Sequence, residues 1–168
     1  TIGITGTDGK TTTATILNQI LKTAKSSAYI GTNGISYLDK TIKMKLTTPT
    51  PDIFYEAYGV FKKHNINDLV MEVSSEGILD GRIERLEFDG AIFTNLSHEH
   101  LNTHRTMEQY FKTKTKLFEN LKKKALAVIN SDDFYATEAI AHTKAKVVTY
   151  GINSGTYQAK NIQLDVLS

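Results

Sequence analysis

The sequence has no cysteine, and only two of its 168 residues are proline. Without cysteine the chain can form neither a disulfide nor a thiolate zinc site, which argues against redox chemistry. A reducing compartment suits such a chain, so we expect a cytoplasmic protein. Both prolines lie in Thr47-Thr48-Pro49-Thr50-Pro51, a stretch that interrupts any regular helix or strand.

The sequence also has no large excess of charge of either sign. Its 20 Lys and Arg residues are balanced by 18 Asp and Glu residues, for a formal net charge of +2. This balance gives no electrostatic reason to expect nucleic acid or an acidic membrane surface. No apolar run approaches the roughly 18 to 20 residues of a membrane helix. We therefore expect no nucleic-acid partner and no membrane partner. The alternative, nucleic-acid binding, would rest on the lysines at positions 112, 114, 116 and 122–124.

Apolar strand-like runs alternate with helical periodicity along the whole chain. The pattern predicts strands at residues 1–5, 69–73, 90–94, 126–129 and 146–150, and helices near 10–24, 52–64, 107–121 and 134–142. Strands that are apolar on both faces and interleaved with helices indicate a mostly parallel sheet covered on both sides. The fold class is therefore α/β, doubly wound, in one domain.

Three segments depart from this alternation. Residues 28–46 contain Gly31, Gly34 and an alternating apolar pattern, which predicts a small hairpin insertion. The run Lys122-Lys123-Lys124 is expected to cap the C-terminus of the preceding helix, where cations are favoured. The chain starts inside a strand without an initiator Met, so we expect it to be part of a longer protein.

A glycine-rich loop follows the first predicted strand and opens the first predicted helix. Its sequence is Gly6-Thr7-Asp8-Gly9-Lys10-Thr11. In this context backbone N–H groups wrap phosphate, Lys10 reaches the outer phosphates and the Thr11 hydroxyl binds Mg²⁺. The full P-loop pattern would need glycine at Ile4, so the shorter form carries the prediction. The alternative is a glycine turn beside a surface lysine.

Lys114 lies in the apolar stripe of the third predicted helix, residues 107–121. The stripe consists of Met107, Tyr110, Phe111, Leu117, Phe118 and Leu121. A lysine that faces the core loses hydration, which lowers its pKa and increases the fraction of free amine. Free amine reacts with CO₂ to give a carbamate, an anionic oxygen ligand for Mg²⁺. The alternative is a lysine whose head bends out to solvent.

Two further groups of polar residues follow predicted strands, at the edge where α/β sheets bind ligands. Asn95 begins a segment that includes His98, Glu99, His100 and His104. Glu72 stands near the end of another strand and is followed by Ser74-Ser75. Carboxylate and imidazole at this edge could hold a metal ion that bridges phosphates. For each histidine taken alone, a structural or surface role is the alternative.

These motifs, taken in order, resemble the Mur ligases. The resemblance is carried by Gly6-Thr7-Asp8-Gly9-Lys10-Thr11-Thr12-Thr13, Thr47-Thr48-Pro49, Met71-Glu72-Val73-Ser74-Ser75 and Phe93-Thr94-Asn95-Leu96-Ser97. Residues 107–118 are similar to the helix that carries the family's carbamylated lysine, and the match falls on Lys114. Glu72-Val73-Ser74-Ser75 followed by Arg82 looks most like the MurE type, the UDP-N-acetylmuramoyl-tripeptide synthetases.

The resemblance implies an ATP-dependent ligase of peptidoglycan precursor synthesis that adds an amino acid to UDP-N-acetylmuramoyl-L-alanyl-D-glutamate through an acyl phosphate. It implies that Lys10, Lys114 and His100 are catalytic. Mg²⁺ would be held by Thr11, Glu72, His100 and the carbamate on Lys114. ATP would be bound by Gly6, Thr7, Asp8, Gly9, Lys10, Thr11, Thr12 and Asn95. The UDP-sugar peptide would be bound by Thr47, Thr48, Ser74 and Arg82.

By the same resemblance, the chain would be part of the central ATPase domain, without the N-terminal UDP-binding and C-terminal ligase domains. Two positions depart from the family pattern: Asn102 stands where many relatives have Asp, and Glu99 stands where Asp is common. Asn102 loses a charge, which could alter metal affinity. Two other functions stay open: another ligase of the superfamily, such as folylpolyglutamate synthetase, and a non-ligating subunit that binds nucleotide.

Overall fold

A computed structural model describes residues 1–97 and 106–163 of the chain. Its helices are α1 (Lys10–Lys22), α2 (Pro51–Lys63), α3 (Ser75–Leu79), α5 (Met107–Glu119) and α6 (Ala136–Ala141). Its strands are β1 (Ile2–Thr5), β2 (Ser27–Gly31), β3 (Gly34–Tyr37), β4 (Lys40–Ile42), β5 (Asp68–Glu72), β6 (Phe88–Phe93), β7 (Leu121–Asn130), β8 (Lys146–Gly151) and β9 (Tyr157–Gln158).

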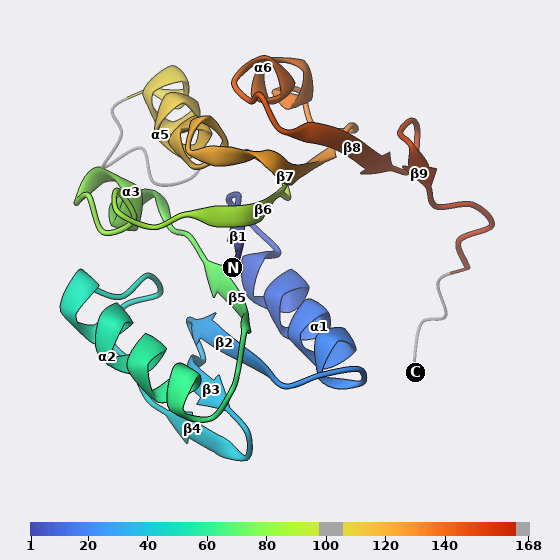
Figure 1. Ribbon diagram of the computed structural model, residues 1–168. Helices are drawn as coiled ribbons and strands as arrows, with labels where there is room; N and C mark the ends of the chain where they lie inside the picture. Colours follow the sequence, from blue (N-terminus) through green and yellow to red (C-terminus); the bar gives the residue numbers. More distant parts are fainter. Residues whose placement is uncertain (98–105, 164–168) are drawn as a thin grey trace, which may run out of the picture.

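In the described part of the chain, the strands form a single sheet in the order β4-β3-β2-β5-β1-β6-β7-β8-β9 (Figure 1). All neighbouring pairs in the stretch β2-β5-β1-β6-β7-β8-β9 are parallel. The strands β3 and β4 extend the sheet beyond β2 as antiparallel strands. The mostly parallel α/β sheet and the hairpin insertion are thus confirmed. The carboxyl ends of β1, β2, β5 and β6 lie at one edge, because these four strands run in the same direction.

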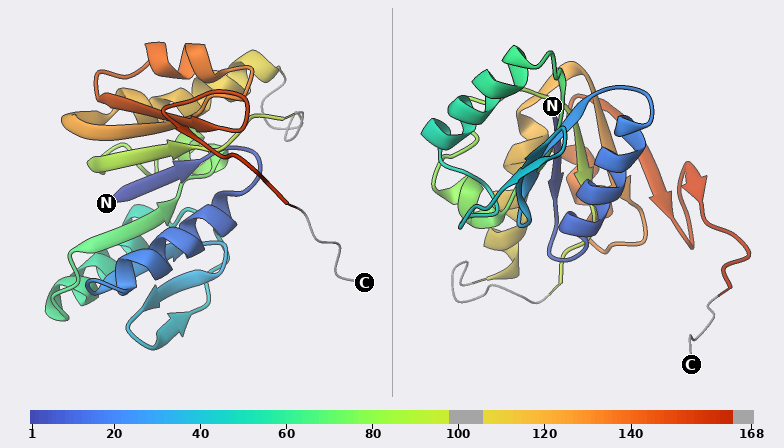
Figure 2. Two further views of the ribbon diagram at one scale, coloured as in Figure 1. Left: turned by 90° about the vertical axis from the view of Figure 1, so that its right-hand side faces the viewer. Right: turned by 90° about the horizontal axis from the view of Figure 1, so that it is seen from below.

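Helices cover both faces of the sheet (Figure 2). On one face α1 packs through Ala14 on the buried residues Ile4, Tyr29 and Val70. On the other face α2, α3, α5 and α6 enclose a larger core that includes Phe61, Ile78, Phe111, Leu117 and Ala139. Burial of this apolar area supplies most of the driving force for folding and fixes the loops that leave the strand ends.

Three elements differ from the sequence prediction. Lys122–Lys124 does not cap α5, because the helix ends at Glu119 and the lysines belong to β7. The ammonium of Lys122 instead pairs with the carboxylates of Glu87 at 3.3 Å and Asp89 at 3.0 Å. The short elements α3 and β9 were not predicted, since five and two residues are too few to set up a periodicity.

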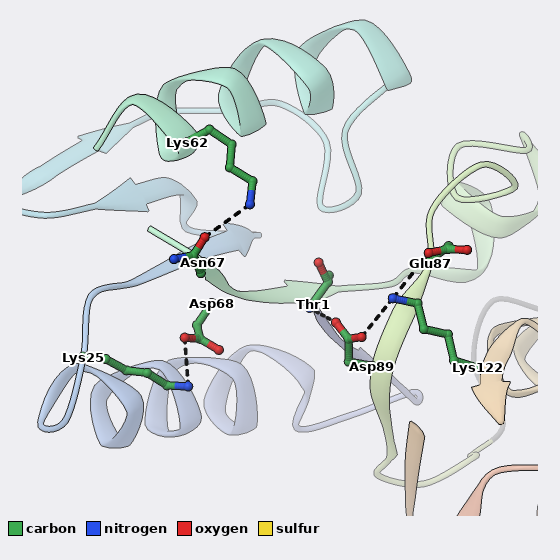
Figure 3. A network of polar contacts seen from close by, with 8 residues as sticks. All are labelled: Thr1, Lys25, Lys62, Asn67, Asp68, Glu87, Asp89 and Lys122. Carbon is green, nitrogen blue, oxygen red and sulfur yellow. Dashed lines mark hydrogen bonds and ion pairs between the residues drawn. The ribbon is translucent and has the colours of Figure 1, made fainter. Parts of the chain in front are cut away.

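Exposed polar contacts tie the opposite edge of the sheet, where β1, β5 and β6 begin (Figure 3). Lys25 pairs with Asp68 at 2.9 Å, and Lys62 donates to the side-chain oxygen of Asn67 at 3.2 Å. A cavity of 490 Å³ opens beside Lys62 and Asn67. Exposed pairs of this kind contribute little to stability, and parallel sheets bind ligands at their carboxyl edge. We therefore place the functional site at the other edge.

Candidate functional site

The phosphate loop connects β1 to α1 at the carboxyl edge of the sheet. Gly9 stands at the N-cap of α1 with φ of 77°, and Lys10 is the first helical residue. Gly6 has φ of 150°, and a Cβ there would lie 1.9 Å from the Thr94 hydroxyl oxygen. Only glycine fits that approach. The first N–H groups of α1 have no carbonyl partner within the helix, so they are available to phosphate.

The segment after β6 binds the phosphate loop along its length. The backbone N–H of Thr7 donates to Asn95 O at 2.9 Å, and that of Asp8 donates to Asn95 Oδ1 at 2.9 Å. The Thr94 hydroxyl donates to Asp8 O at 2.6 Å, and the Ser97 N–H donates to Thr7 Oγ1 at 3.0 Å. The loop is therefore preorganised by residues that lie almost 90 positions away in the sequence.

Two lysines point to one carbonyl of this loop. Lys10 Nζ donates to Gly6 O at 2.9 Å and to Thr7 O at 2.7 Å. Lys114 Nζ donates to the same Gly6 oxygen at 2.9 Å, and it lies 4.4 Å from the centre of the Tyr110 ring. The helix α5 thus brings a distant amine to the residue where phosphate is expected.

Lys114 is buried with only 1% of its surface exposed, which excludes the alternative that its head bends out to solvent. Burial, followed by repulsion from Lys10, lowers the pKa of Lys114 to about 7, although Glu76 acts in the opposite direction. A substantial fraction of the side chain is therefore free amine near neutral pH. Lys112 and Lys116 on the same helix are exposed, as the helical periodicity predicts.

The lowered pKa of Lys114 predicts a dependence of stability on pH. The unfolded lysine keeps its proton up to about 10.5, whereas the folded one loses it near 7, so the unfolded state binds more protons between these values. The free energy of unfolding should therefore rise as the pH increases from 7 to 10.5. Below pH 7 the lysine is protonated in both states, so this gain in stability is absent. In bicarbonate-free buffer, urea unfolding of the wild type and of Lys114→Met measures the difference. Identical pH profiles for the two proteins would contradict the assignment.

Glu72 ends β5 next to the phosphate loop and is completely buried. Its Oε2 accepts a hydrogen bond from the Thr11 hydroxyl at 2.9 Å and another from the Thr32 hydroxyl at 3.2 Å. Its Oε1 accepts from the Tyr29 hydroxyl and from the Thr32 N–H at 3.1 Å. Burial and the hydrogen bond to Glu72 raise the pKa of Tyr29, so the phenol stays a proton donor.

The residues predicted to contact substrate lie together beside Glu72. The hydroxyl of Thr48 accepts from the N–H of Ser74 at 2.8 Å and donates to Glu72 O at 3.1 Å. Arg82 donates to Thr48 O at 2.9 Å and pairs with Asp80. A cleft of 380 Å³ opens here, with Thr47, Ser74 and Arg82 in its wall. Thr32 joins the cleft to the carboxylate, because its hydroxyl lies 3.2 Å from that of Thr47.

Most of the predicted nucleotide and metal residues thus come together, with two qualifications. Thr12 is exposed on the first turn of α1, where it makes none of the loop contacts described above. His100 lies outside the described residues, as do Glu99 and Asn102. Within residues 1–97 and 106–163, no group of three or more His, Asp or Glu side chains could hold a metal ion.

Several polar residues at the site carried no signal that a single sequence could reveal. Tyr29 and Thr32 approach Glu72 only through the pairing of β2 with β5. Asn130 donates to Thr94 O at 2.8 Å, and Asp133 accepts from the N–H of Leu96 at 2.8 Å. Asn130 ends β7 and Asp133 follows it, and both bind the segment after β6 that contacts the phosphate loop.

The side chains present suit a magnesium ion. Mg²⁺ prefers oxygen ligands and is held in proteins by one or two carboxylates together with substrate phosphates. Glu72 Oε2 and the Thr11 hydroxyl offer two such oxygens 2.9 Å apart at the mouth of the phosphate loop. A carbamate on Lys114 would add a third kind of oxygen ligand from α5.

Comparisons with known proteins agree on one family. The family described as Mur ligase middle domain matches residues 4–166. The UDP-N-acetylmuramoyl-L-alanyl-D-glutamate–2,6-diaminopimelate ligase of Chlamydia pneumoniae is 40% identical over 166 residues, which cover 98% of this chain and 34% of that protein. The corresponding L-lysine ligase of Staphylococcus haemolyticus is 40% identical over 169 residues, which cover 97% of this chain and 34% of that protein.

A solved structure gives the same result at the level of the fold. A UDP-N-acetylmuramoyl-L-alanyl-D-glutamate–2,6-diaminopimelate ligase superimposes with a TM-score of 0.81 at 31% identity, covering 93% of this chain and 32% of that chain. The chain therefore spans about a third of the length of these relatives. Among the helices that the structure describes, none is long and apolar enough to cross a membrane.

Proposed function

The chain belongs to the Mur ligase family, and from this we propose that it is the ATP-binding part of a ligase that adds an amino acid to UDP-N-acetylmuramoyl-L-alanyl-D-glutamate. One observation carries the proposal. Hydrogen bonds run from Thr11 at the phosphate loop through Glu72 and Thr32 to Thr47 in the 380 Å³ cleft. A triphosphate and a carboxylate substrate would thus meet over one buried carboxylate.

The reaction has two steps. The substrate carboxylate attacks the γ-phosphorus of ATP, which forms an acyl phosphate and releases ADP. The amine of the incoming amino acid then attacks the acyl carbon, and phosphate leaves with the C–O bonding electrons while the amine loses a proton. The first step brings a carboxylate against the triphosphate, and the second develops negative charge on the acyl oxygen and the leaving phosphate, so the protein acts chiefly through positioning and charge neutralisation.

Each residue of the site has a defined part in this scheme. Lys10 and the N-terminus of α1 bind and neutralise the phosphates of ATP. Glu72, the Thr11 hydroxyl and His100 would hold Mg²⁺, which supplies charge neutralisation between the two substrates. The free amine of Lys114 would form an N–C bond with CO₂ and release a proton, which gives an anionic oxygen ligand in place of a cation. Because the reaction uses ATP, we place it in the cytoplasm.

Thr48, Ser74 and Arg82 orient the UDP-peptide, whose carboxylate receives the phosphoryl group. Thr48 and Ser74 are fixed to each other and to the backbone of Glu72, and Arg82 is fixed by Thr48 O and Asp80. An arginine held in this way presents its remaining N–H groups in a defined plane that suits a carboxylate or a phosphate. The residues Thr47-Thr48-Pro49 and Ser74-Ser75 at this cleft, together with 40% identity to muramoyl-dipeptide ligases, favour the muramoyl ligase over a folylpolyglutamate synthetase.

ADP release by the full-length protein tests the proposal. The protein is supplied with Mg-ATP and UDP-N-acetylmuramoyl-L-alanyl-D-glutamate, with lysine, with meso-diaminopimelate or without an amine. Release that needs the dipeptide precursor and one of the amines supports the ligase and identifies the amino acid, which differs between the relatives named above. Release that is indifferent to both substrates would point to a nucleotide-binding subunit that does not ligate.

Arg82→Lys should weaken binding of the UDP-peptide selectively. A lysine keeps the charge but cannot keep the planar contact to Thr48 O while presenting a second donor pair to substrate. Hydrogen bonds to charged groups contribute about 1.5 to 3 kcal/mol, so KM for the UDP-peptide should rise about 10- to 100-fold. KM for ATP should stay near that of the wild type in the same steady-state assay. Arg85→Lys on the nearby exposed turn is the matched control; equal changes in both KM values would refute the role.

A further inference from the structure

The two oxygens of the Glu72 carboxylate have different surroundings. Oε1 accepts hydrogen bonds from the hydroxyl of Tyr29 in β2 and from the backbone N–H of Thr32, which follows β2. Oε2 accepts from the hydroxyls of Thr11 and Thr32, and Thr11 belongs to the phosphate loop. A carboxylate oxygen has about two lone-pair sites, so both oxygens are filled, and the donors of Oε1 come from β2 and the turn that follows it.

The pairing of β2 with β5 places the Tyr29 hydroxyl next to Oε1. Tyr29 pairs with Val70, two residues before Glu72, and both Tyr29 and Glu72 are buried, with 3% and 0% of their surface exposed. Gly31 makes the approach possible, because a Cβ there would lie 2.2 Å from Oε1 and 2.4 Å from the Tyr29 hydroxyl. The N–H of Asn33 donates to the same hydroxyl at 3.3 Å, which leaves the phenolic proton directed at Glu72.

The hydroxyl donors at Oε2 are different in kind. Thr11 is the residue whose hydroxyl is expected to turn to the metal, and the side chain of Thr32 is exposed at the rim of the site. A hydroxyl can rotate away and accept or donate elsewhere, whereas the backbone N–H of Thr32 and the enclosed phenol of Tyr29 have no such freedom. Oε2 can therefore be given up to a cation at a lower cost than Oε1.

We propose that Tyr29 and the backbone amide of Thr32 retain Oε1, so that Glu72 offers a divalent cation only Oε2 and the site favours Mg²⁺ over Ca²⁺. Mg²⁺ demands near-ideal octahedral geometry and takes carboxylates through single oxygens, whereas Ca²⁺ accepts six to eight ligands and often binds both oxygens of a carboxylate. Tyr29 is in this sense a positioning residue that determines metal specificity. The inference rests on the proposed Mg²⁺-dependent function.

Tyr29→Phe tests this inference, because it removes one oxygen atom and leaves the ring in place. Oε1 is then held by the Thr32 N–H alone and can turn to the cation. Loss of a partner of a metal ligand typically costs 10- to 100-fold in affinity, so the affinity for Mg²⁺ should fall about 10-fold or more. The affinity for Ca²⁺ should fall less or increase, so the Ca²⁺/Mg²⁺ affinity ratio should rise about 10-fold.

The readout is metal binding and needs no turnover. Mn²⁺ bound to the full-length protein with a non-hydrolysable ATP analogue is followed by electron paramagnetic resonance, corrected for Mn²⁺ bound to the analogue alone, and is displaced by Mg²⁺ or by Ca²⁺. Thr32→Val is the matched variant, because it removes the hydroxyl on Oε2 and keeps the N–H on Oε1. It should keep the Ca²⁺/Mg²⁺ ratio of the wild type.

Tyr37→Phe controls for the loss of a buried phenol as such, since Tyr37 lies on the neighbouring strand β3 and packs against Phe61. Melting temperatures of all three variants establish that they are folded. If the wild type shows no protein-bound Mn²⁺, the proposed function itself fails. If the wild type binds Mn²⁺ but Tyr29→Phe leaves the ratio unchanged, or Thr32→Val changes it equally, only the role of Tyr29 is overturned.

Discussion

Lys114→Ala is expected to reduce substrate-dependent ADP release by about 10² to 10³-fold or more, and added bicarbonate should not restore it. The variant loses the amine that α5 brings to the phosphate loop, at 2.9 Å from Gly6 O. Without that amine no carbamate can form at this position, so Mg²⁺ is left short of an anionic ligand. Normal turnover by Lys114→Ala would exclude the carbamate from the mechanism.

Two further variants distinguish loss of the Lys114 amine from loss of its packing. Lys114→Met fills the same space with an apolar chain, so it should be as inactive as the alanine variant yet melt at the wild-type temperature or above, since no amine is left to desolvate. Lys112→Ala changes an exposed lysine of the same helix and should keep full activity. Wild type depleted of CO₂ should lose activity and regain it with bicarbonate.

Gly6→Ala should abolish nucleotide binding while leaving the sheet folded. The new methyl carbon would stand 1.9 Å from the Thr94 hydroxyl oxygen and 3.0 Å from the backbone of Asn95. To remove this steric clash the segment after β6 must move away from Gly6. The hydrogen bonds from that segment to the phosphate loop are then lost. Binding of a fluorescent ATP analogue by the full-length protein measures the loss, with a rise in Kd of about 100-fold or more expected.

Gly59→Ala is the control for this substitution. Gly59 lies in the middle of α2, where an added Cβ meets no atom within 4 Å and alanine is the better helix former. This variant should therefore bind the analogue as the wild type does and be slightly more stable. Nucleotide binding by Gly6→Ala at the wild-type level would mean that the observed loop shape is not required.

The sequence predicted the sheet well because its central strands are apolar and are separated by periodic helices. Five parallel strands and the hairpin at the β2 edge lie where the pattern placed them. The lysine run at positions 122–124 misled the prediction, because charge suggested a helix end, whereas the lysines lie exposed at the beginning of β7, where Lys122 pairs with Glu87 and Asp89. The periodicity of apolar residues, which indicates strands and helices, is visible in the sequence. The ion-pair partner of an exposed lysine is not.

The candidate site was predicted unevenly for a related reason. Lys114 was identified because a charge in an apolar stripe conflicts with its surroundings, and the burial of that residue is confirmed. Tyr29 offered no such conflict, since a tyrosine in a buried strand is ordinary. Its role depends on the register between β2 and β5 and on the missing side chain of Gly31, which are properties of two strands some 40 residues apart.

The hydrogen bonds between the phosphate loop and the segment after β6 also set the order in which the protein can assemble. They join residues 86 to 90 positions apart, so the motif at the start of the chain has no fixed shape until the sixth strand has been made and has paired with the first. Contacts of such long range form late in folding. During synthesis, therefore, a nascent chain that carries the complete phosphate-binding motif should still be unable to bind nucleotide until β6 and the residues that follow it have left the ribosome.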